Sequence, residues 1–161
     1  GCRRFPGRLF QVWPDFIFED CRLKPVLLVD DNDRYAEMLD KYFRDRGYTP
    51  ERAFNGKDAL GMFKGKPADY YRAIVTDITM ESQLAGLSFL WEIKKLGFHG
   101  TIVVASTGFD FPLAMPLSRM VLTGWGVHYL VPKAPMKRAG IIEFYPVSLF
   151  SSTLKEFQEV Q

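Results

Sequence analysis

Residues 25–33 read PVLLVDDND, an unbroken apolar run that ends abruptly in acidic residues. A short continuous apolar run of this kind is typical of a strand that is buried on both faces of a parallel sheet. Over residues 33–46 the apolar side chains then recur at helical spacing, and Gly47 supplies the expected stop. The segment therefore predicts a buried strand, an acidic turn and a helix.

The same alternation of strand and helix continues along the chain. Further strands are predicted over 48–53, 73–76, 101–106 and 127–131, and further helices over 58–63, 87–96, 111–122 and 151–160. Five strands that alternate with helices indicate an α/β fold in which helices cover both faces of an open parallel sheet.

Length and charge narrow the class of protein. The chain has 161 residues, which suits one ordinary domain with appendages. Residues 1–24 hold five basic and three acidic residues, and the remainder of the chain is neutral. A neutral body lacks the basic excess that drives nucleic-acid binding, and no apolar run approaches the roughly 20 residues of a membrane-spanning helix. Cys2 and Cys21, as isolated thiols, suit a reducing compartment, so we expect a cytoplasmic protein.

Polar residues follow four of the predicted strands at the point where each strand ends. They are Asp30 with Asp31, Asp77, Ser106 and Lys133. Taken singly, an acid or a serine after a strand is usually a helix cap or a turn residue, and a lysine is usually solvated. Open parallel sheets, however, bind ligands at the carboxyl ends of their strands. We therefore expect these side chains to meet in one crevice.

Three clustered carboxylates would repel one another and raise one another's pKa unless a cation compensates them. Mg²⁺ is the simple choice because it prefers oxygen ligands and often shares its site with phosphate. A carboxylate beside Mg²⁺ can act as a nucleophile toward phosphorus. A hydroxyl and an ammonium would then bind the phosphoryl oxygens.

The chain resembles the receiver domain of two-component response regulators over about residues 24–133. The resemblance rests on VLLVDDN at 26–32, NGKDAL at 55–60, IVTDITM at 74–80, GL at 86–87, VVAS at 103–106 and YLVPK at 129–133. It implies a flavodoxin-like (βα)5 fold, a doubly wound parallel five-stranded sheet in the order 2-1-3-4-5.

The resemblance also implies a role for each residue at the strand ends. Asp77 would be the phosphoacceptor and would receive a phosphoryl group from a histidine kinase or a histidine phosphotransfer protein. Asp30, Asp31, Asp77 and the backbone carbonyl of Thr79 would hold Mg²⁺. Ser106 would be the switch hydroxyl and Lys133 the partner of the phosphoryl group. Such a domain catalyses only its own phosphorylation and dephosphorylation and is not a conventional enzyme.

Three positions depart from the family pattern. Glu81 stands where the family usually has proline, with one extra residue before the glycine. Ala134 separates Lys133 from Pro135, so the family's cis peptide bond is expected between Ala134 and Pro135. The aromatic switch position carries Leu130, with Tyr129 one place earlier. Because side chains alternate along a strand, these two should point to opposite faces and alter the usual coupling.

Two segments outside the matched region each have more than one possible role. Residues 1–24 form an aromatic, basic extension, and residues 25–161 form the receiver with an enlarged 134–150 segment before the last helix. That segment would be a hydrophobic cover on the sheet or a docking surface for a downstream protein partner that the sequence does not identify. The extension would pack on the domain, mediate a homodimer or belong to a larger protein. His99 and His128 lack a metal-ligand spacing and are interpreted as structural or surface residues.

Three other functions fit the sequence less well. A pseudo-receiver would keep the fold as a protein-interaction module without phosphorylation, and the intact acids argue against it. A phosphatase that uses Asp77 as its nucleophile would want a second acid at the position of Thr79. A flavin binder would meet repulsion between its phosphate and the acids after the first strand.

Overall fold

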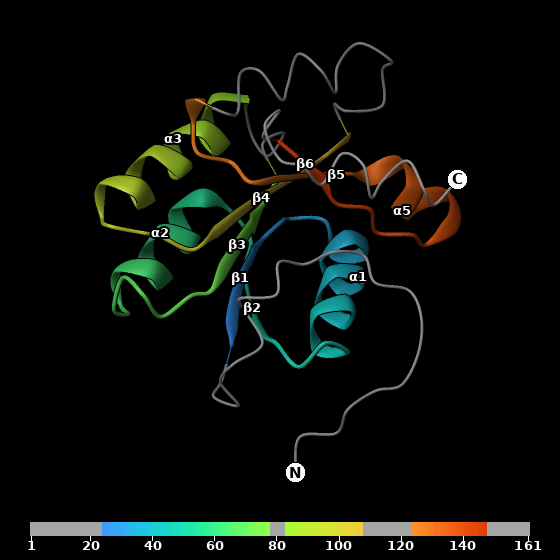
Figure 1. The fold of residues 1–161 in the computed structure, drawn as a ribbon, viewed down its shortest axis with the longest axis horizontal. Coiled ribbons are helices and arrows are strands. Elements are labelled where there is room, and N and C mark those ends of the chain that lie inside the picture. The colour runs from blue at the N-terminus through green and yellow to red at the C-terminus, as the bar shows by residue number, and fades with distance from the viewer. Residues whose placement is uncertain (1–23, 78–82, 108–123, 148–161) are drawn as a thin grey trace.

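The computed structural model describes residues 24–77, 83–107 and 124–147, which form an α/β layered structure around one sheet (Figure 1). The strands are β1 Pro25–Val29, β2 Thr49–Ala53, β3 Ala73–Thr76, β4 Thr101–Ser106, β5 Tyr129–Pro132 and β6 Tyr145–Pro146. The helices are α1 Asp33–Arg44, α2 Gly56–Lys64, α3 Gln83–Lys95 and α5 Lys133–Ala139. In space the strands follow the order β2-β1-β3-β4-β5-β6.

The first five strands are parallel and confirm the predicted order 2-1-3-4-5. β1 lies inside the sheet, with Leu27 beside Glu51 of β2 and Ile74 of β3, and all five of its residues are buried. That position explains its continuous apolar run, since neither face of β1 meets water. β6 was not predicted. It runs antiparallel to β5 and contains only two residues, which is too short to show a periodic pattern.

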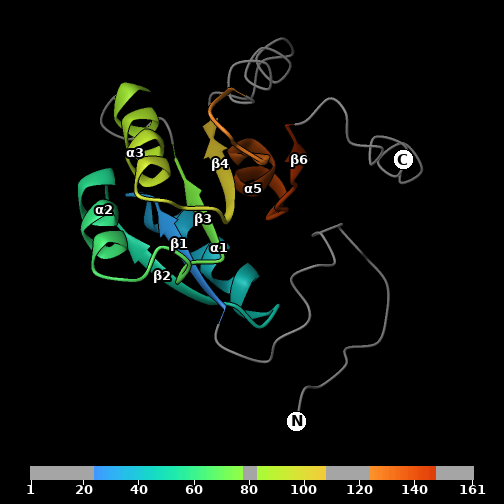
Figure 2. The same cartoon turned by 60° about the vertical axis from the view of Figure 1, so that its left-hand side comes forward.

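Helices cover both faces of the sheet, with α2 and α3 on one face and α1 and α5 on the other (Figure 2). Alternate positions of β1 divide between two cores. Leu27 and Val29 pack with the α2 and α3 side chains, whereas Val26 and Leu28 pack with Leu39 and Phe43 of α1. This alternation matters for the site because it fixes the face to which each residue after a strand points.

Asparagine caps begin the first two helices. The Asn32 side chain accepts a hydrogen bond from the Tyr35 N–H, and the Asn55 side chain accepts one from the Asp58 N–H. Each cap satisfies a backbone donor that the first helical turn leaves without a helical partner. The predicted starts are therefore correct for α1 and two residues late for α2.

The region after β5 forms a short helix and a returning strand. Ile142, Phe144 and Val147 are buried, which supports the hydrophobic-cover interpretation for these residues, while Ile141 stays exposed. The expected cis bond before Pro135 was wrong, because the described residues contain no cis peptide bond. Pro135 instead occupies the first turn of α5, where its missing N–H costs no helical hydrogen bond.

Tyr129 and Leu130 point to opposite faces, as the alternation predicted. Leu130 is fully buried in the core with α2 and α3. Tyr129 packs on the α1 face, where its ring lies edge-on to Phe144 at 6.2 Å between centroids. The aromatic side chain of β5 therefore lies on the face opposite to that of Leu130, which occupies the family's switch position.

Several expectations fall outside the described residues. These are the 1–23 part of the extension, the helices predicted over 111–122 and 151–160, and the loop that carries Thr79 and Glu81. Within the described ranges, none of the helices has the length and apolar character needed to cross a membrane.

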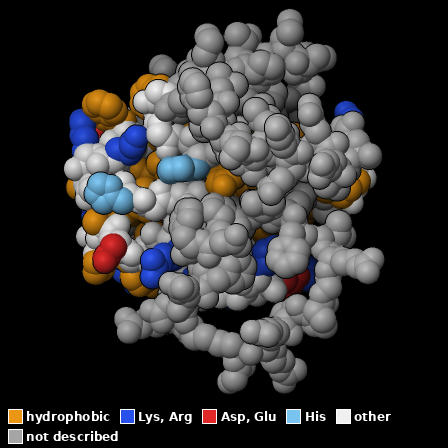
Figure 3. All heavy atoms as spheres, in the orientation of Figure 1, with side chains coloured by type: hydrophobic (Ala, Val, Ile, Leu, Met, Phe, Trp, Pro, Cys, Tyr) orange, Lys and Arg blue, Asp and Glu red, His pale blue; other side chains and the backbone are white. Residues whose placement is uncertain are grey.

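His128 has the structural role that the sequence allowed. Its side chain is exposed, and both histidines of the chain show as pale blue surface patches in Figure 3. Even so, its Nδ1 accepts a hydrogen bond of 3.0 Å from the Ile102 N–H at the entry to β4. Although the residue is exposed overall, partial desolvation of its ring, together with the charge of Lys94, lowers the pKa of His128. The imidazole is therefore held neutral as an acceptor.

We expect this contact to make stability depend on pH. Above about 6.5, the ordinary histidine pKa, both folded and unfolded chains hold His128 neutral and the contact contributes fully. As pH falls below that value the unfolded chain takes up the proton first, so the unfolding free energy falls. The slope is at most about 1.4 kcal/mol per pH unit and is reduced by the ring's exposure. Urea unfolding at several pH values measures it.

The matched variant is His128→Asn, whose side-chain oxygen can accept the same N–H without titrating. The difference in unfolding free energy between wild type and variant should shrink as the pH is lowered through this range. Parallel curves for the two proteins would contradict the assignment.

Candidate functional site

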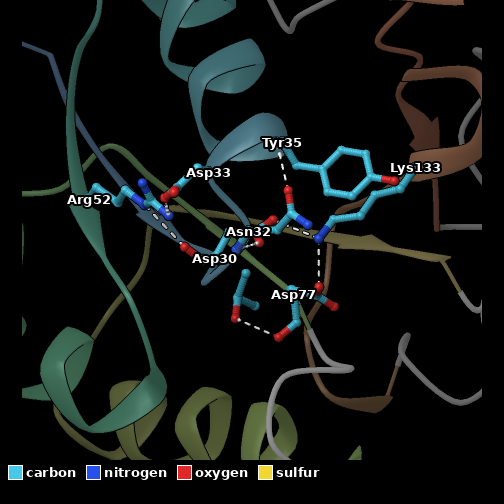
Figure 4. A network of polar contacts seen from close by, with 8 residues as sticks. Asp30, Asn32, Asp33, Tyr35, Arg52, Asp77 and Lys133 are labelled. Atoms are coloured by element: carbon cyan, nitrogen blue, oxygen red, sulfur yellow. Dashed lines mark hydrogen bonds and ion pairs between the residues drawn. The ribbon is translucent and has the colours of Figure 1, made fainter. Parts of the chain in front are cut away.

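Asp30, Asp77 and Lys133 meet at the carboxyl ends of the central strands (Figure 4). The Lys133 Nζ lies 2.6 Å from Asp30 Oδ2 and 2.6 Å from Asp77 Oδ2. All three side chains are buried, and that of Lys133 is only 1% exposed. Three of the predicted site residues therefore lie together, with one ammonium in contact with both carboxylates.

The sheet itself directs these three side chains to one place. Val29 pairs with Thr76, so Asp30 and Asp77 each follow at the same level, and the Asp77 N–H donates to the Val29 carbonyl. By alternation Asp30 follows Val26 and Leu28, Asp77 follows Val75, and Lys133 follows Val131, all of which face α1. Two strand ends and the start of α5 thus place their polar groups on the same face.

Tyr35 of α1 completes the surroundings of the ammonium. The Lys133 Nζ lies 4.6 Å from the centroid of the Tyr35 ring, a cation–π arrangement that suits a desolvated charge. Sequence reasoning missed this role, because Tyr35 read as one of the apolar residues on the buried face of the helix. The available signal was its place in the first turn after the acidic pair, directly beside the strand end.

The charges of the cluster do not balance. Asp30 Oδ1 accepts a hydrogen bond of 2.9 Å from the Asn32 N–H, and Lys133 contacts the other oxygen. Burial nevertheless raises the pKa of Asp30, with the charge of Asp77 adding to the effect. Two buried carboxylates against one ammonium leave one negative charge, and the exposed Asp31 adds another. The arrangement would therefore accommodate a cation.

Ser106 is fully buried at the end of β4. Val104 pairs with Thr76, and Ser106 pairs with Pro132. Ser106 therefore lies at the same end of the sheet, one residue beyond the level of Asp77 and one before that of Lys133. Alternation with Val104, however, turns it toward the face of α2 and α3, opposite to the face of Asp30 and Asp77. Thr79, the predicted carbonyl ligand, lies outside the described residues.

The donor set fits a hard divalent cation. Among the described residues, no three side chains of His, Cys, Asp or Glu already converge as a metal site. Mg²⁺ does not require three, since it is usually held by one or two carboxylates with several waters. Asp30 and Asp77 offer buried carboxylate oxygens, and Asp31, which follows Asp30 in the chain, is exposed. The uncompensated negative charge described above favours such an ion.

Comparison with known proteins agrees with this geometry. The family model described as the response regulator receiver domain matches residues 26–116. An NtrX-like response regulator of Rickettsia conorii is 33% identical over 90 residues, and one of Rickettsia felis is 32% identical. Each match covers 50% of this chain and 18% of the relative, so the chain spans less than a fifth of these longer proteins.

Solved structures with the same fold include chemotaxis protein CheY4 of Vibrio cholerae and response regulator TrrA of Thermotoga maritima. CheY4 is 20% identical with a TM-score of 0.58, and the match covers 87% of this chain and 100% of CheY4. TrrA is 25% identical with a TM-score of 0.54, and the match covers 85% of this chain and 97% of TrrA. With more than half of its length matched by the family model, the chain belongs to the response regulator receiver domain family.

Proposed function

We propose that this protein is the phosphoacceptor of a two-component phosphorelay, taking a phosphoryl group onto Asp77 from a histidine kinase or a histidine phosphotransfer protein. The observation that carries the proposal is the buried contact of Lys133 with both Asp77 and Asp30 at 2.6 Å. Burying three charged groups costs stability, and such networks of perturbed groups are common at functional sites. A phosphoryl group on Asp77 would lie beside the Lys133 ammonium.

The chemistry follows from the positions of these groups. One oxygen of the Asp77 carboxylate attacks the phosphorus of a phosphohistidine. The new O–P bond forms as the P–N bond breaks, and the imidazole leaves with the electron pair and takes up a proton. Lys133 neutralises charge on the transferred group, and Ser106 binds one of its oxygens. Water later cleaves the acyl phosphate, so the only reactions are self-phosphorylation and self-dephosphorylation.

In this proposal Asp30, Asp31, Asp77 and the Thr79 carbonyl would hold Mg²⁺, which would neutralise charge on the phosphoryl oxygens. The Thermotoga relative was solved in complex with Mg²⁺ and BeF, which supports Mg²⁺ as the cation of this proposal. Phosphorylation would change the binding surface for a downstream protein partner. The isolated thiols suit the cytoplasm, where we place the reaction.

Incubation with acetyl phosphate and Mg²⁺ should add one phosphate to the wild-type protein and none to Asp77→Asn, because the amide is not a nucleophile toward phosphorus. Intact-protein mass spectrometry measures the product. Asp69→Asn is the matched control, since Asp69 is an exposed aspartate outside the cluster, and it should be phosphorylated like the wild type.

Two outcomes would overturn the proposal. Absence of any mass shift in the wild type, under conditions that modify a known receiver, would favour the phosphorylation-independent pseudo-receiver instead. A phosphate retained by Asp77→Asn would place the acceptor elsewhere.

A further inference from the structure

Arg52 reaches from the edge strand β2 to the turn that carries the acidic pair (Figure 4). Its Nε donates a hydrogen bond of 3.1 Å to the Asp30 backbone carbonyl. Its Nη2 lies 2.8 Å from Asp33 Oδ1, at the first residue of α1. One guanidinium therefore contacts both ends of the four-residue turn formed by residues 30–33, through a hydrogen bond at Asp30 and an ion pair with the exposed Asp33.

The side chain of Arg52 is well fixed for this task. It is only 25% exposed, and its guanidinium lies 4.3 Å from the centroid of the Phe54 ring. A planar group with several donors in a fixed fork can join a carbonyl to a carboxylate, whereas a lysine ammonium offers a single point charge. The contacts of Arg52 thus link the end of β1 to the start of α1, in addition to the Asn32 cap and the bond of the Asn32 N–H to Asp30 Oδ1.

This turn is the segment that presents both acids of the proposed cation site. Asp30 and Asp31 occupy its first two positions, and the Asn32 N–H binds back to Asp30 Oδ1 at 2.9 Å. Mg²⁺ demands near-ideal octahedral geometry, so displacing a ligand by a fraction of an ångström weakens binding. Groups that orient metal ligands from behind commonly change affinity about 10–100-fold when they are lost.

We propose that Arg52 is a positioning residue for the cation site, holding the turn of residues 30–33 so that its carboxylates meet the ion in a fixed arrangement. The inference rests on the proposed function, because it concerns the Mg²⁺ of that site. Arg52 itself touches neither the ion nor the acceptor.

The charge of Arg52 and its positioning role predict opposite changes in Mg²⁺ affinity when the residue is replaced, so one measurement distinguishes them. Arg52 carries a positive charge near a site for a cation, so by charge alone its removal would strengthen Mg²⁺ binding. As a positioning residue its removal must weaken binding. Arg52→Gln therefore separates the two by the sign of the change, and Arg52→Lys keeps the charge while losing the fork.

The experiment is a titration of the whole chain with MgCl₂ alone, followed by isothermal calorimetry and by backbone amide shifts of residues 30–33. Both Arg52→Gln and Arg52→Lys should bind Mg²⁺ about tenfold more weakly than the wild type. Arg44→Gln is the matched control. Arg44 pairs with Asp40 on the exposed side of α1, away from the turn, and its loss should leave the affinity unchanged.

The outcomes distinguish the inference from the function on which it rests. Unchanged or tighter binding by Arg52→Gln, with normal binding by the wild type, overturns the positioning role and leaves the proposed function standing. Failure of the wild type to bind Mg²⁺ overturns both. If Arg52→Gln does not fold, Arg52→Lys decides, because wild-type affinity in that variant would also overturn the inference.

Discussion

Replacement of Lys133 by methionine should destabilise the protein by about 3–5 kcal/mol when divalent cations are removed with EDTA. The side chain of Lys133 is 1% exposed and its ammonium contacts two buried carboxylates. Methionine fills most of the same volume, so the loss reflects charge rather than a cavity. Asp30 and Asp77 would be left buried without a counter-charge. Urea unfolding followed by circular dichroism measures the change.

The same variant should recover part of its stability when Mg²⁺ is added, and more than the wild type gains. Without the ammonium, the cluster carries more uncompensated negative charge, which binds a cation more strongly. Lys41→Met is the matched control, because Lys41 is exposed and pairs with Asp45 at the surface. Its effect should stay within about 0.5 kcal/mol. A loss below 1 kcal/mol for Lys133→Met in EDTA would contradict the network as described.

The second large effect on stability is expected at Glu51, a β2 residue that lies outside the Asp77 cluster. Its two carboxylate oxygens accept hydrogen bonds from the Tyr70 and Tyr71 hydroxyls, at 2.7 and 2.8 Å. Tyr71 is fully buried, and burial together with the bond to Glu51 raises its pKa. Glu51→Leu should cost about 3 kcal/mol in unfolding free energy, because a buried hydroxyl loses its acceptor. Urea unfolding measures it.

Variants that each remove one of the two hydrogen bonds test this interpretation of Glu51. Tyr71→Phe removes the bond together with its donor, and the acceptor that it leaves, Glu51 Oε2, belongs to a half-buried residue, so the cost should be only about 1–1.5 kcal/mol. Tyr70→Phe should cost less, because Tyr70 is only half-buried. Combining Glu51→Leu with Tyr71→Phe should recover part of the loss, since no hydroxyl then remains to be satisfied. Strict additivity of the two changes would refute the pairing.

The sequence was most informative where burial and periodicity agree. The apolar run of β1 exists because that strand has a neighbour on either side, so its pattern and its place in the sheet have one cause. Asp30, Asp77 and Lys133 could be expected together because each directly follows a buried strand. Side chains alternate between the two faces along β1, β3 and β5, and the number of residues in each strand places all three polar groups on the same face.

The parts that escaped prediction depend on which elements become neighbours in space. Arg52 reads as a solvated residue of an edge strand, and only the pairing of β1 with β2 brings it to the Asp30 carbonyl. Tyr35 joins the site because α1 packs against the end of β5 and the start of α5, a contact no periodic pattern contains. β6 is held by the partner strand rather than by its own two residues.

β6 also reduces the length of free strand edge at which another chain could pair with the sheet. A free strand edge is a template on which a foreign strand can add or copies can stack. Here β6 pairs with Tyr129 and Leu130, and the Val147 N–H donates to the His128 carbonyl, so part of the β5 edge is already occupied. The opposite edge strand, β2, carries Pro50 and two charged residues, which discourage pairing. Addition of a foreign strand is therefore disfavoured at β2 and at the part of the β5 edge that β6 covers.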